Sequence, residues 1–283
     1  EYVPGIDYWK ASTCGMCPAG CGIVVRTREH KANKIEGNPL HPINRGALCA
    51  RGQAGLEILY NPDRMKGPMK RGGERGEGKW QEISWEEAIK TLAEQLRQLK
   101  SKGEADGIVF ATQTSQGVIG IAIECLRSAV DAKFWSLEES SSREMPRSYI
   151  SNYGRAANPI FDISNATYLL SFGARFLETW HSPVMYSLAF GEFRASRGKT
   201  RGRLVQVEPR MSLTGANADE WIPAKVGREG LTALAIAQVI VREKLARNQD
   251  ALKLLHEPLD AYAPELTTEL TGIAAERIQR IAR

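Results

Sequence analysis

The stretch STCGMCPAGCG, residues 12–22, places three cysteines within eight residues, and a fourth cysteine follows far downstream. The spacing is C-x2-C-x3-C-x27-C, formed by Cys14, Cys17, Cys21 and Cys49. Four thiolates in this pattern suit a cubane iron–sulfur cluster. The interleaved glycines favour the same interpretation, because residues without a Cβ atom let backbone N–H groups approach the cluster sulfides. These glycines are Gly15, Gly20 and Gly22.

Other interpretations of the cysteines stay open. A structural zinc site usually has two C-x2-C pairs, or one pair with two histidines. Here the second half of the pattern has only Cys49, and His30 and His41 have no pairing pattern. A disulfide framework is disfavoured, because the chain is long and its five cysteines are an odd count. Cys125, in the apolar run IAIECLRSAV, is expected to be a buried helix thiol.

The composition is that of an ordinary globular protein. The 283 residues are 42% hydrophobic and 25% charged, which leaves room for two domains with a sizeable core. The net charge of +5 is concentrated in stretches such as KGPMKRGGERGEGK (66–79), which we expect to be solvated loops. Nothing in the pattern favours nucleic-acid binding. The longest apolar run, LTALAIAQVIV (231–241), is too short to span a bilayer and predicts a buried helix.

Both ends of the sequence suggest a piece of something longer. The chain begins with Glu1 rather than Met, as a processed export signal would explain. It ends inside an amphipathic pattern, TGIAAERIQRIAR, with no stop signal behind it. We therefore expect the front part of a larger protein.

The pattern of the chain changes near residue 80. Residues 1–80 hold short β-like runs (CGIVVRTR, NKIEGNP and GKWQEIS) separated by turn residues, and predict a small, mostly β domain that carries all four cysteines. Ser84 and Glu87 form a capping box that opens a helix, WEEAIKTLAEQLRQLK. Residues 81–283 then alternate strands and helices. The fold class is therefore α/β, with a parallel sheet covered on both faces.

Ligands of such sheets bind beyond the carboxyl ends of the strands. Three strand ends are candidates: Thr112–Thr114, Gly173–Arg175 and Glu208–Arg210. Gly173 would permit close approach to a phosphate, although an ordinary βα turn explains it equally well. The dinucleotide fingerprint G-x-G-x-x-G is absent from these loops, so a conventional NAD site is disfavoured.

Several strings together resemble the molybdopterin oxidoreductase family, the bis-(molybdopterin guanine dinucleotide) enzymes related to dimethyl sulfoxide reductase. The strings are STCGMCPAGCG, KIEGNPLHPINRGALCARGQAG, YNPDR, RGEGKWQEISWEEA and SFGARFLETW. The resemblance covers nearly the whole chain. It implies a cluster domain and the first α/β domain of the family, truncated before the later domains.

The resemblance also implies roles for individual residues. Cys14, Cys17, Cys21 and Cys49 would ligate a [4Fe–4S] cluster, and Arg51, in CARG, would lie between cluster and pterin in the path of electron transfer, unless it is a surface arginine. The candidate contacts of the cofactor nucleotide come from SFGAR, VEPR and VGREG: Gly173, Arg175, Glu208, Arg210 and Gly227. VGREG replaces the family's usual proline–glycine–threonine–aspartate loop, and so puts nucleotide binding in doubt.

Members of the family bind molybdenum through Cys, selenocysteine, Ser or Asp. By its spacing to Gly154, that position falls near Ser141, in a window without cysteine. Ser141 or its neighbours Ser140 and Ser142 could ligate the metal. A solvated Glu/Ser-rich turn without a metal is the alternative.

Two functions follow from the resemblance. One is a redox subunit that relays electrons through the cluster to or from a molybdenum or tungsten bis-(molybdopterin guanine dinucleotide) site. The other is a molybdenum-free electron-transfer or scaffold subunit of a membrane-bound quinol-oxidising respiratory complex. Either implies an iron–sulfur or cytochrome partner, a membrane-anchor subunit, and the rest of the molybdopterin fold if the chain is a fragment. The implied location is the periplasm or the outer face of the cytoplasmic membrane.

Overall fold

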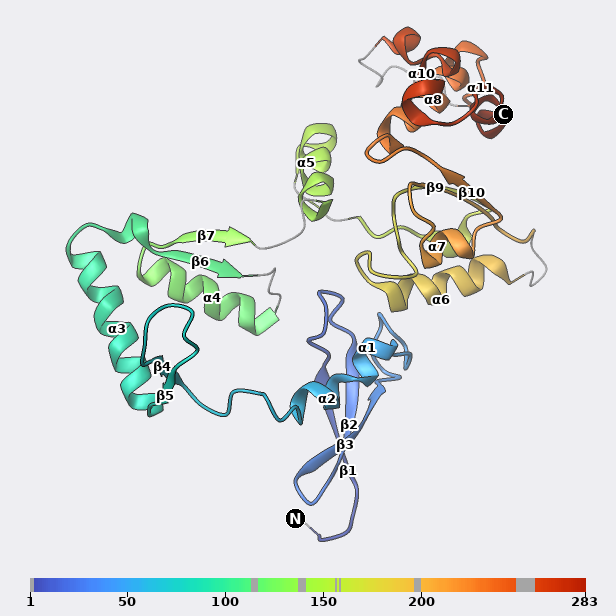
Figure 1. The fold of residues 1–283 in the computed structure, drawn as a ribbon. Coiled ribbons are helices and arrows are strands. Elements are labelled where there is room, and N and C mark those ends of the chain that lie inside the picture. The colour runs from blue at the N-terminus through green and yellow to red at the C-terminus, as the bar shows by residue number, and fades with distance from the viewer. Residues whose placement is uncertain are drawn as a thin grey trace. The chain divides into compact units, whose positions relative to one another are not determined.

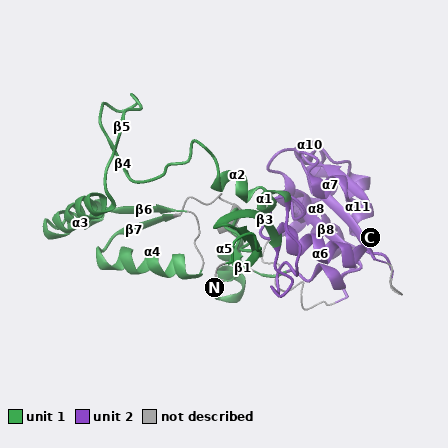
Figure 2. Cartoon of the chain, turned by 90° about the horizontal axis from the view of Figure 1, so that it is seen from below, with its two compact units in different colours: residues 1–36, 50–160 green, residues 37–49, 161–283 purple. Residues whose placement is uncertain are grey.

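A computed structural model describes residues 3–112, 117–136, 141–155, 157, 159–195, 200–247 and 258–283 (Figure 1). The chain forms two compact units, coloured separately in Figure 2. Unit 1 comprises residues 1–36 and 50–160, and unit 2 comprises residues 37–49 and 161–283. The domain boundary between residues 80 and 81 stays a prediction.

Unit 1 begins with a three-stranded sheet in the order β1-β2-β3. The strands are β1 (Tyr8–Thr13), β2 (Gly22–Arg28) and β3 (Lys31–Gly37). β1 and β2 are antiparallel, and Glu29 and His30 both have positive φ between β2 and β3. Two consecutive left-handed residues are typical of the tightest hairpin turns. The predicted β character of the N-terminal region is therefore present.

Short helices and a small hairpin follow. They are α1 (Ala50–Gln53), α2 (Gly55–Leu59), β4 (Met69–Arg71) and β5 (Trp80–Glu82). The long helix α3 (Trp85–Ser101) begins where the capping box predicts, because Ser84 Oγ accepts a hydrogen bond from the Glu87 N–H at 3.1 Å.

The rest of unit 1 is a β–α–β arrangement. The short helix η1 (Ala105–Gly107) leads to β6 (Val109–Thr112), which pairs in parallel with β7 (Lys133–Ser136). Helix α4 (Gly117–Ala129) connects these strands, and α5 (Ser141–Tyr153) follows them. In the described part of the chain, neither α3 nor α4 contributes a buried residue. Cys125 on α4 is exposed, so the expectation of a buried thiol was wrong: two strands give the helix too little surface to cover it.

Unit 2 is built on a parallel sheet in the order β10-β9-β8. Its strands are β8 (Tyr168–Phe172), β9 (Arg203–Glu208) and β10 (Glu220–Pro223). The longer helices are α6 (Pro183–Arg194), α8 (Glu229–Arg242), α10 (Pro264–Thr271) and α11 (Ala275–Ala282). Short helices complete it: η2 (Ile163–Asn165), α7 (Leu213–Ala216) and η3 (Leu259–Tyr262).

Alternate residues of β9 point into two different cores. Val205 and Val207 pack with Ile222 of β10 and with α8 and α11. Leu204 points the other way and packs with Tyr186 and Phe193 of α6. The sheet is covered on both faces, as the strand–helix alternation predicts, and α8 buries part of the apolar run 231–241. The parallel strands nevertheless form two sheets, one in each unit.

Candidate functional site

The first three cysteines lie on one closed loop of unit 1. β1 and β2 pair up to Thr13 and Gly22, and the next residues inward, Cys14 and Cys21, are joined by a hydrogen bond from the Cys14 N–H to the Cys21 carbonyl at 2.8 Å. The loop 14–21 is therefore the end of a hairpin. The ladder fixes the position of both of its ends, and Cys17 lies between them.

The environment of this loop suits a cluster. Cys21 is buried, whereas Cys14 and Cys17 are partly exposed. Gly20 has φ +59°, a left-handed conformation that glycine adopts without strain. A Cβ atom at Gly15 would meet no atom within 4 Å. The loop thus leaves space on the side of Gly15.

The three thiols of the loop do not by themselves form a metal-binding group in the described structure. Within the described ranges, no three His, Cys, Asp or Glu side chains form a group that could hold a metal ion. Thiolates repel one another, and a metal site forms together with the binding of its metal. The thiol chemistry and the closed loop fit an iron–sulfur cluster.

Cys49 ends a compact segment of unit 2, residues 37–49. Gly37 touches the Gly46 backbone so closely that a side chain at residue 37 would not fit. Asn44 is fully buried, and its Nδ2 donates to the Ala47 carbonyl at 2.7 Å. These contacts determine the path of the backbone that leads to the fourth cysteine.

Arg51 lies on α1, two residues after Cys49 in the sequence, and is exposed. An exposed arginine at this position is compatible both with a role between cluster and pterin and with an ordinary surface arginine. Its role in electron transfer therefore stays a prediction.

The predicted nucleotide contacts share one edge of the sheet in unit 2. Because β8, β9 and β10 are parallel, their carboxyl ends meet at that edge. The loops there carry Gly173 and Arg175 after β8, Glu208 and Arg210 at the end of β9, and Gly227 after β10. The structure therefore brings together residues that are far apart in the sequence.

The two glycines of this edge both have a left-handed backbone, which glycine adopts without strain. Gly173 has φ +65° and Gly227 has φ +71°. The Gly173 N–H donates to the Val207 carbonyl at 2.9 Å, which ties the loop after β8 to β9. A Cβ at Gly173 would lie 4.0 Å from a carboxylate oxygen of Glu229, the first residue of α8. The loops after β8 and β10 are therefore neighbours.

Glu208 points inward and is 2% exposed. One carboxylate oxygen accepts from the N–H and the hydroxyl of Ser212, at 2.7 and 2.9 Å. The other accepts from the Gln206 amide at 3.2 Å. The carboxylate therefore organises the turn into α7, and its predicted contact with a nucleotide stays a prediction.

Arg210 is exposed and forms an ion pair with Glu178 at 3.3 Å. Glu178 also accepts a hydrogen bond from the Leu213 N–H at 2.9 Å. The Leu213 N–H, and after it the Arg210 guanidinium, holds the pKa of Glu178 below its usual value. Arg175 is exposed, and its carbonyl accepts from the N–H groups of Glu178 and Trp180. Two guanidinium groups thus lie on the solvent side of this edge, where an anion could reach them.

The predicted metal-ligand serines and Thr114 lie wholly or partly outside the described residues. Ser141 is the first residue of α5, but its side chain and that of Ser142 lie outside the described part, as does the whole of Ser140. The same holds for Thr114 at the end of the β6 loop. The metal-ligand role of Ser141 therefore stays a prediction.

Sequence reasoning missed the polar residues beneath the edge. Gln206, Glu178 and Ser212 join the loops after β8 and β9 through the hydrogen bonds described above. Gln206 could have been noticed, because a glutamine inside the apolar strand RLVQVE is unusual in a buried position. Glu178 and Ser212 give no comparable signal.

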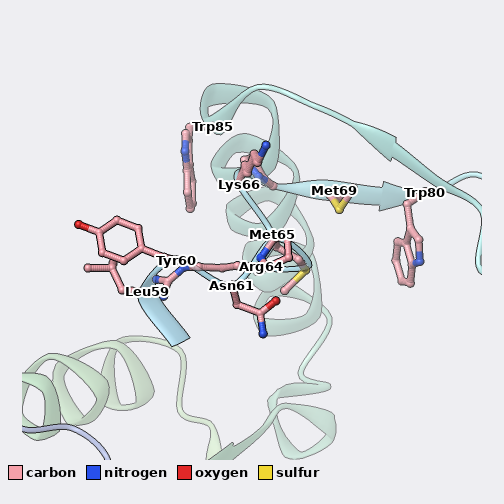
Figure 3. Close-up of a pocket in the computed structure, with 12 residues that line it drawn as sticks. Leu59, Tyr60, Asn61, Arg64, Met65, Lys66, Met69, Trp80 and Trp85 are labelled. Carbon is pink, nitrogen blue, oxygen red and sulfur yellow. The ribbon is translucent and has the colours of Figure 1, made fainter. Parts of the chain in front are cut away.

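Unit 1 also holds an open groove, lined by residues between Leu59 and Trp85 (Figure 3). These residues lie outside the cysteine loop 14–21. Tyr60, Met65, Trp80 and Trp85 are each more than half exposed there. The groove has two cationic side chains and no carboxylate in its lining: Arg64 and Lys66. It contains none of the predicted site residues.

Comparison with known proteins identifies the family. The family model described as the molybdopterin oxidoreductase Fe4S4 domain matches residues 7–61, and the model described as molybdopterin oxidoreductase matches residues 64–262. The chain belongs to the molybdopterin oxidoreductase family. The two matched regions are those of a [4Fe–4S] cluster domain and of a molybdopterin oxidoreductase domain.

Related members of the family are longer than this chain. It is 24% identical to the menaquinone reductase molybdopterin-binding-like subunit of Nitratidesulfovibrio vulgaris, over 99% of this chain and 40% of the relative. It is 31% identical to a sulfite dehydrogenase subunit of Allochromatium vinosum, over 87% of this chain and 26% of the relative. It is 26% identical to the molybdopterin-containing thiosulfate reductase subunit PhsA of Salmonella typhimurium, over 96% of this chain and 36% of the relative.

A solved structure supports the fold. Acetylene hydratase from Pelobacter acetylenicus matches with a TM-score of 0.77 at 21% identity, over 96% of this chain and 38% of that chain. This confirms the predicted fold class, α/β with a small β-rich N-terminal part and truncated relative to the family. The chain spans about a quarter to two fifths of the relatives it matches.

Proposed function

We propose that this chain relays electrons through one [4Fe–4S] cluster to or from a molybdenum or tungsten bis-(molybdopterin guanine dinucleotide) site. The observation that carries the proposal is the loop 14–21, which presents three thiols from a closed hairpin end inside the part matched as a cluster domain. Cys49 would be the fourth ligand. When bound, the cluster supplies one-electron transfer, which no side chain of the chain provides.

The protein's own residues bind and orient. The hydrogen bond between Cys14 and Cys21 holds the two outer thiols of the loop at neighbouring positions of the hairpin. In unit 2, the guanidinium groups of Arg175 and Arg210 would contact the phosphates of the cofactor nucleotide. Gly173 and Gly227 would let the backbone approach them, since neither has a side chain in the way.

Partners and location are part of the same proposal. A single cluster needs an external donor or acceptor, so an iron–sulfur or cytochrome subunit would exchange electrons with this one. A membrane-anchor subunit would hold the complex at the periplasmic face of the cytoplasmic membrane. In the part of the chain that the structure describes, no helix has the length and hydropathy to cross a membrane.

A second function is favoured by a specific observation. One relative is named a molybdopterin-binding-like subunit of a menaquinone reductase. The VGREG loop departs from the family pattern, and no cysteine lies near Ser141. A molybdenum-free electron-transfer or scaffold subunit of a quinol-oxidising complex would have these features.

Metal analysis of the purified protein separates the two. About four iron atoms per chain with stoichiometric molybdenum or tungsten would support the first function. Iron without molybdenum, tungsten or pterin fluorescence would support the second. Recovery of zinc in place of iron would overturn both.

The ligand set is tested by substitution. Cys49→Ser should abolish the electron-resonance signal of the cluster or convert it to that of a smaller cluster. Cys125→Ser is the matched control, because this exposed thiol on α4 lies outside the four-cysteine pattern. Equal iron contents and unchanged spectra in both variants would show that Cys49 is not a ligand.

A further inference from the structure

A row of three polar side chains crosses the sheet of unit 2 just beneath its carboxyl edge. Ser171 on β8 is the direct neighbour of Gln206 on β9, and Gln206 is the direct neighbour of Trp221 on β10. Paired residues of adjacent strands project to the same face of a sheet. The three side chains therefore share one face, the face on which α7 lies: a Cβ at Gly215 of α7 would come within 2.9 Å of the Trp221 ring.

Each of the three side chains has a buried polar atom without a hydrogen-bond partner among the described residues. The atoms are Ser171 Oγ, Gln206 Oε1 and Trp221 Nε1. Ser171 is 7% exposed and Gln206 is fully buried. Leaving one such atom unpaired costs about 1–3 kcal/mol, so three in one row need an explanation.

A different orientation of Gln206 does not remove the problem. Its Nε2 donates to the Glu208 carboxylate at 3.2 Å and to the Ala174 carbonyl at 3.4 Å. Turning the amide over would place its oxygen against two acceptors. The amide is therefore held with Oε1 as the unpartnered end, and the indole N–H of Trp221 can only donate.

We propose that this row binds one ordered water molecule. The water accepts a hydrogen bond from the Trp221 N–H and donates one to Gln206 Oε1. It forms a third with the Ser171 hydroxyl, which can act as donor or acceptor. Three hydrogen bonds are what a buried water in a protein typically makes. Every donor then faces an acceptor.

The three atoms favour water over an ion. They comprise one obligate donor, one acceptor and one hydroxyl that can act as either, and none is charged. A cation would face the Trp221 N–H, and an anion would face the Gln206 oxygen. Water is the small ligand that offers both donors and acceptors.

The water would link the three strands whose carboxyl ends carry the candidate loops. It would also hold the Gln206 amide with its donor side toward Ala174, which belongs to the loop after β8. The site does not depend on the proposed electron relay, since its residues lie beneath the edge.

Ser171→Ala in the full chain tests the site through the sign of its effect. If the hydroxyl binds the water, its removal should lower the melting temperature by about 2–4 °C. If the hydroxyl is buried and unpaired, its removal relieves a cost, and the melting temperature should rise. A rise would overturn the proposal.

A double-mutant cycle tests whether one water serves both outer strands. Ser171 and Trp221 flank Gln206 on opposite sides and are not paired with each other. If one water binds both side chains, removing the indole N–H with Trp221→Phe should be coupled to Ser171→Ala. If the melting-temperature shifts of the two single variants simply add in the double variant, the shared water site is contradicted. A crystal structure at high resolution should show density within hydrogen-bond distance of all three atoms, and its absence there would also overturn the proposal.

Discussion

Gly215 shows how tightly single residues are set beneath the edge of unit 2. A Cβ at this position would overlap the Glu208 carboxylate and lie 2.9 Å from the Trp221 ring. We expect Gly215→Ala to lower the free energy of unfolding by about 1–3 kcal/mol, because Glu208 is held by Ser212 and cannot move away freely. Chemical denaturation measures this. Gly230→Ala in α8 is the control, since a Cβ there meets nothing within 4 Å. Similar losses in the two variants would contradict the steric explanation.

Arg51 gives the second prediction at this scale, which depends on the proposed electron relay. A cation near the cluster would stabilise its reduced state, so Arg51→Ala should lower the reduction potential and slow electron transfer while the iron content stays unchanged. Potentiometric titration followed by electron resonance measures both. Arg51→Lys keeps the charge and should preserve most of the potential. Loss of iron in the alanine variant would instead assign Arg51 a structural role.

At the scale of elements, α4 and α8 have similar apolar sequences and different surroundings. Ile119 on α4 is 68% exposed, whereas Ile236 on α8 is 4% exposed. We expect Ile119→Lys to change the free energy of unfolding by less than about 0.5 kcal/mol and to lower the binding of a hydrophobic dye. Ile236→Lys should cost at least about 3 kcal/mol, because it buries an unpaired charge. A large loss for Ile119→Lys would show that α4 is covered in solution.

Strand β10 is joined to α11 by Glu220. Its carboxylate lies 3.0 Å from Arg277 and forms a second, shorter ion pair with Arg280. The hydrogen bond from Arg280, and then that from Arg277, lowers the pKa of Glu220 below its usual 4.5. A lowered folded-state pKa means that the stabilisation is fully present above pH 4.5 and is lost as the pH falls through the lowered value.

Glu220→Gln should therefore be less stable than the unmodified protein at pH 7, and the difference should shrink as the pH falls below the usual carboxyl value. Thermal unfolding across this pH range measures the change. Glu276→Gln, at an exposed position of α11, serves as the comparison. A constant difference at all pH values would show that the ion pairs do not account for it.

For the whole molecule, the order of strands and helices could be predicted from the sequence. Apolar residues recur with a different spacing in strands and in helices, and characteristic residues mark where each element starts and stops. The capping box at Ser84 and the apolar run that becomes α8 are examples. The strand ends that carry Gly173 and Arg210 were also predicted, and they lie at one edge because parallel strands end on the same side.

Other features depended on contacts between distant segments, which a local pattern does not contain. The exposure of Cys125 follows from how little sheet lies beside α4. The inward turn of Glu208 follows from Ser212 and Gln206, whose hydrogen bonds are set by the turn into α7. The two separate parallel sheets follow from strand pairing that alternation alone does not specify.

The hydrogen bond that closes the loop between Cys14 and Cys21 also bears on how a metal centre would assemble. Ligands joined by a short stretch of chain meet an incoming ion at an effective concentration of about millimolar or higher. Once one thiol of the loop has bound an incoming metal ion, the binding of the other two is therefore close to an intramolecular step. Cys49 lies outside this loop, at the end of the folded segment 37–49, so the hydrogen bond that closes the loop does not position the fourth ligand. Assembly would therefore be slowest at its final ligand, where a partly built cluster is most open to oxygen and to chelators.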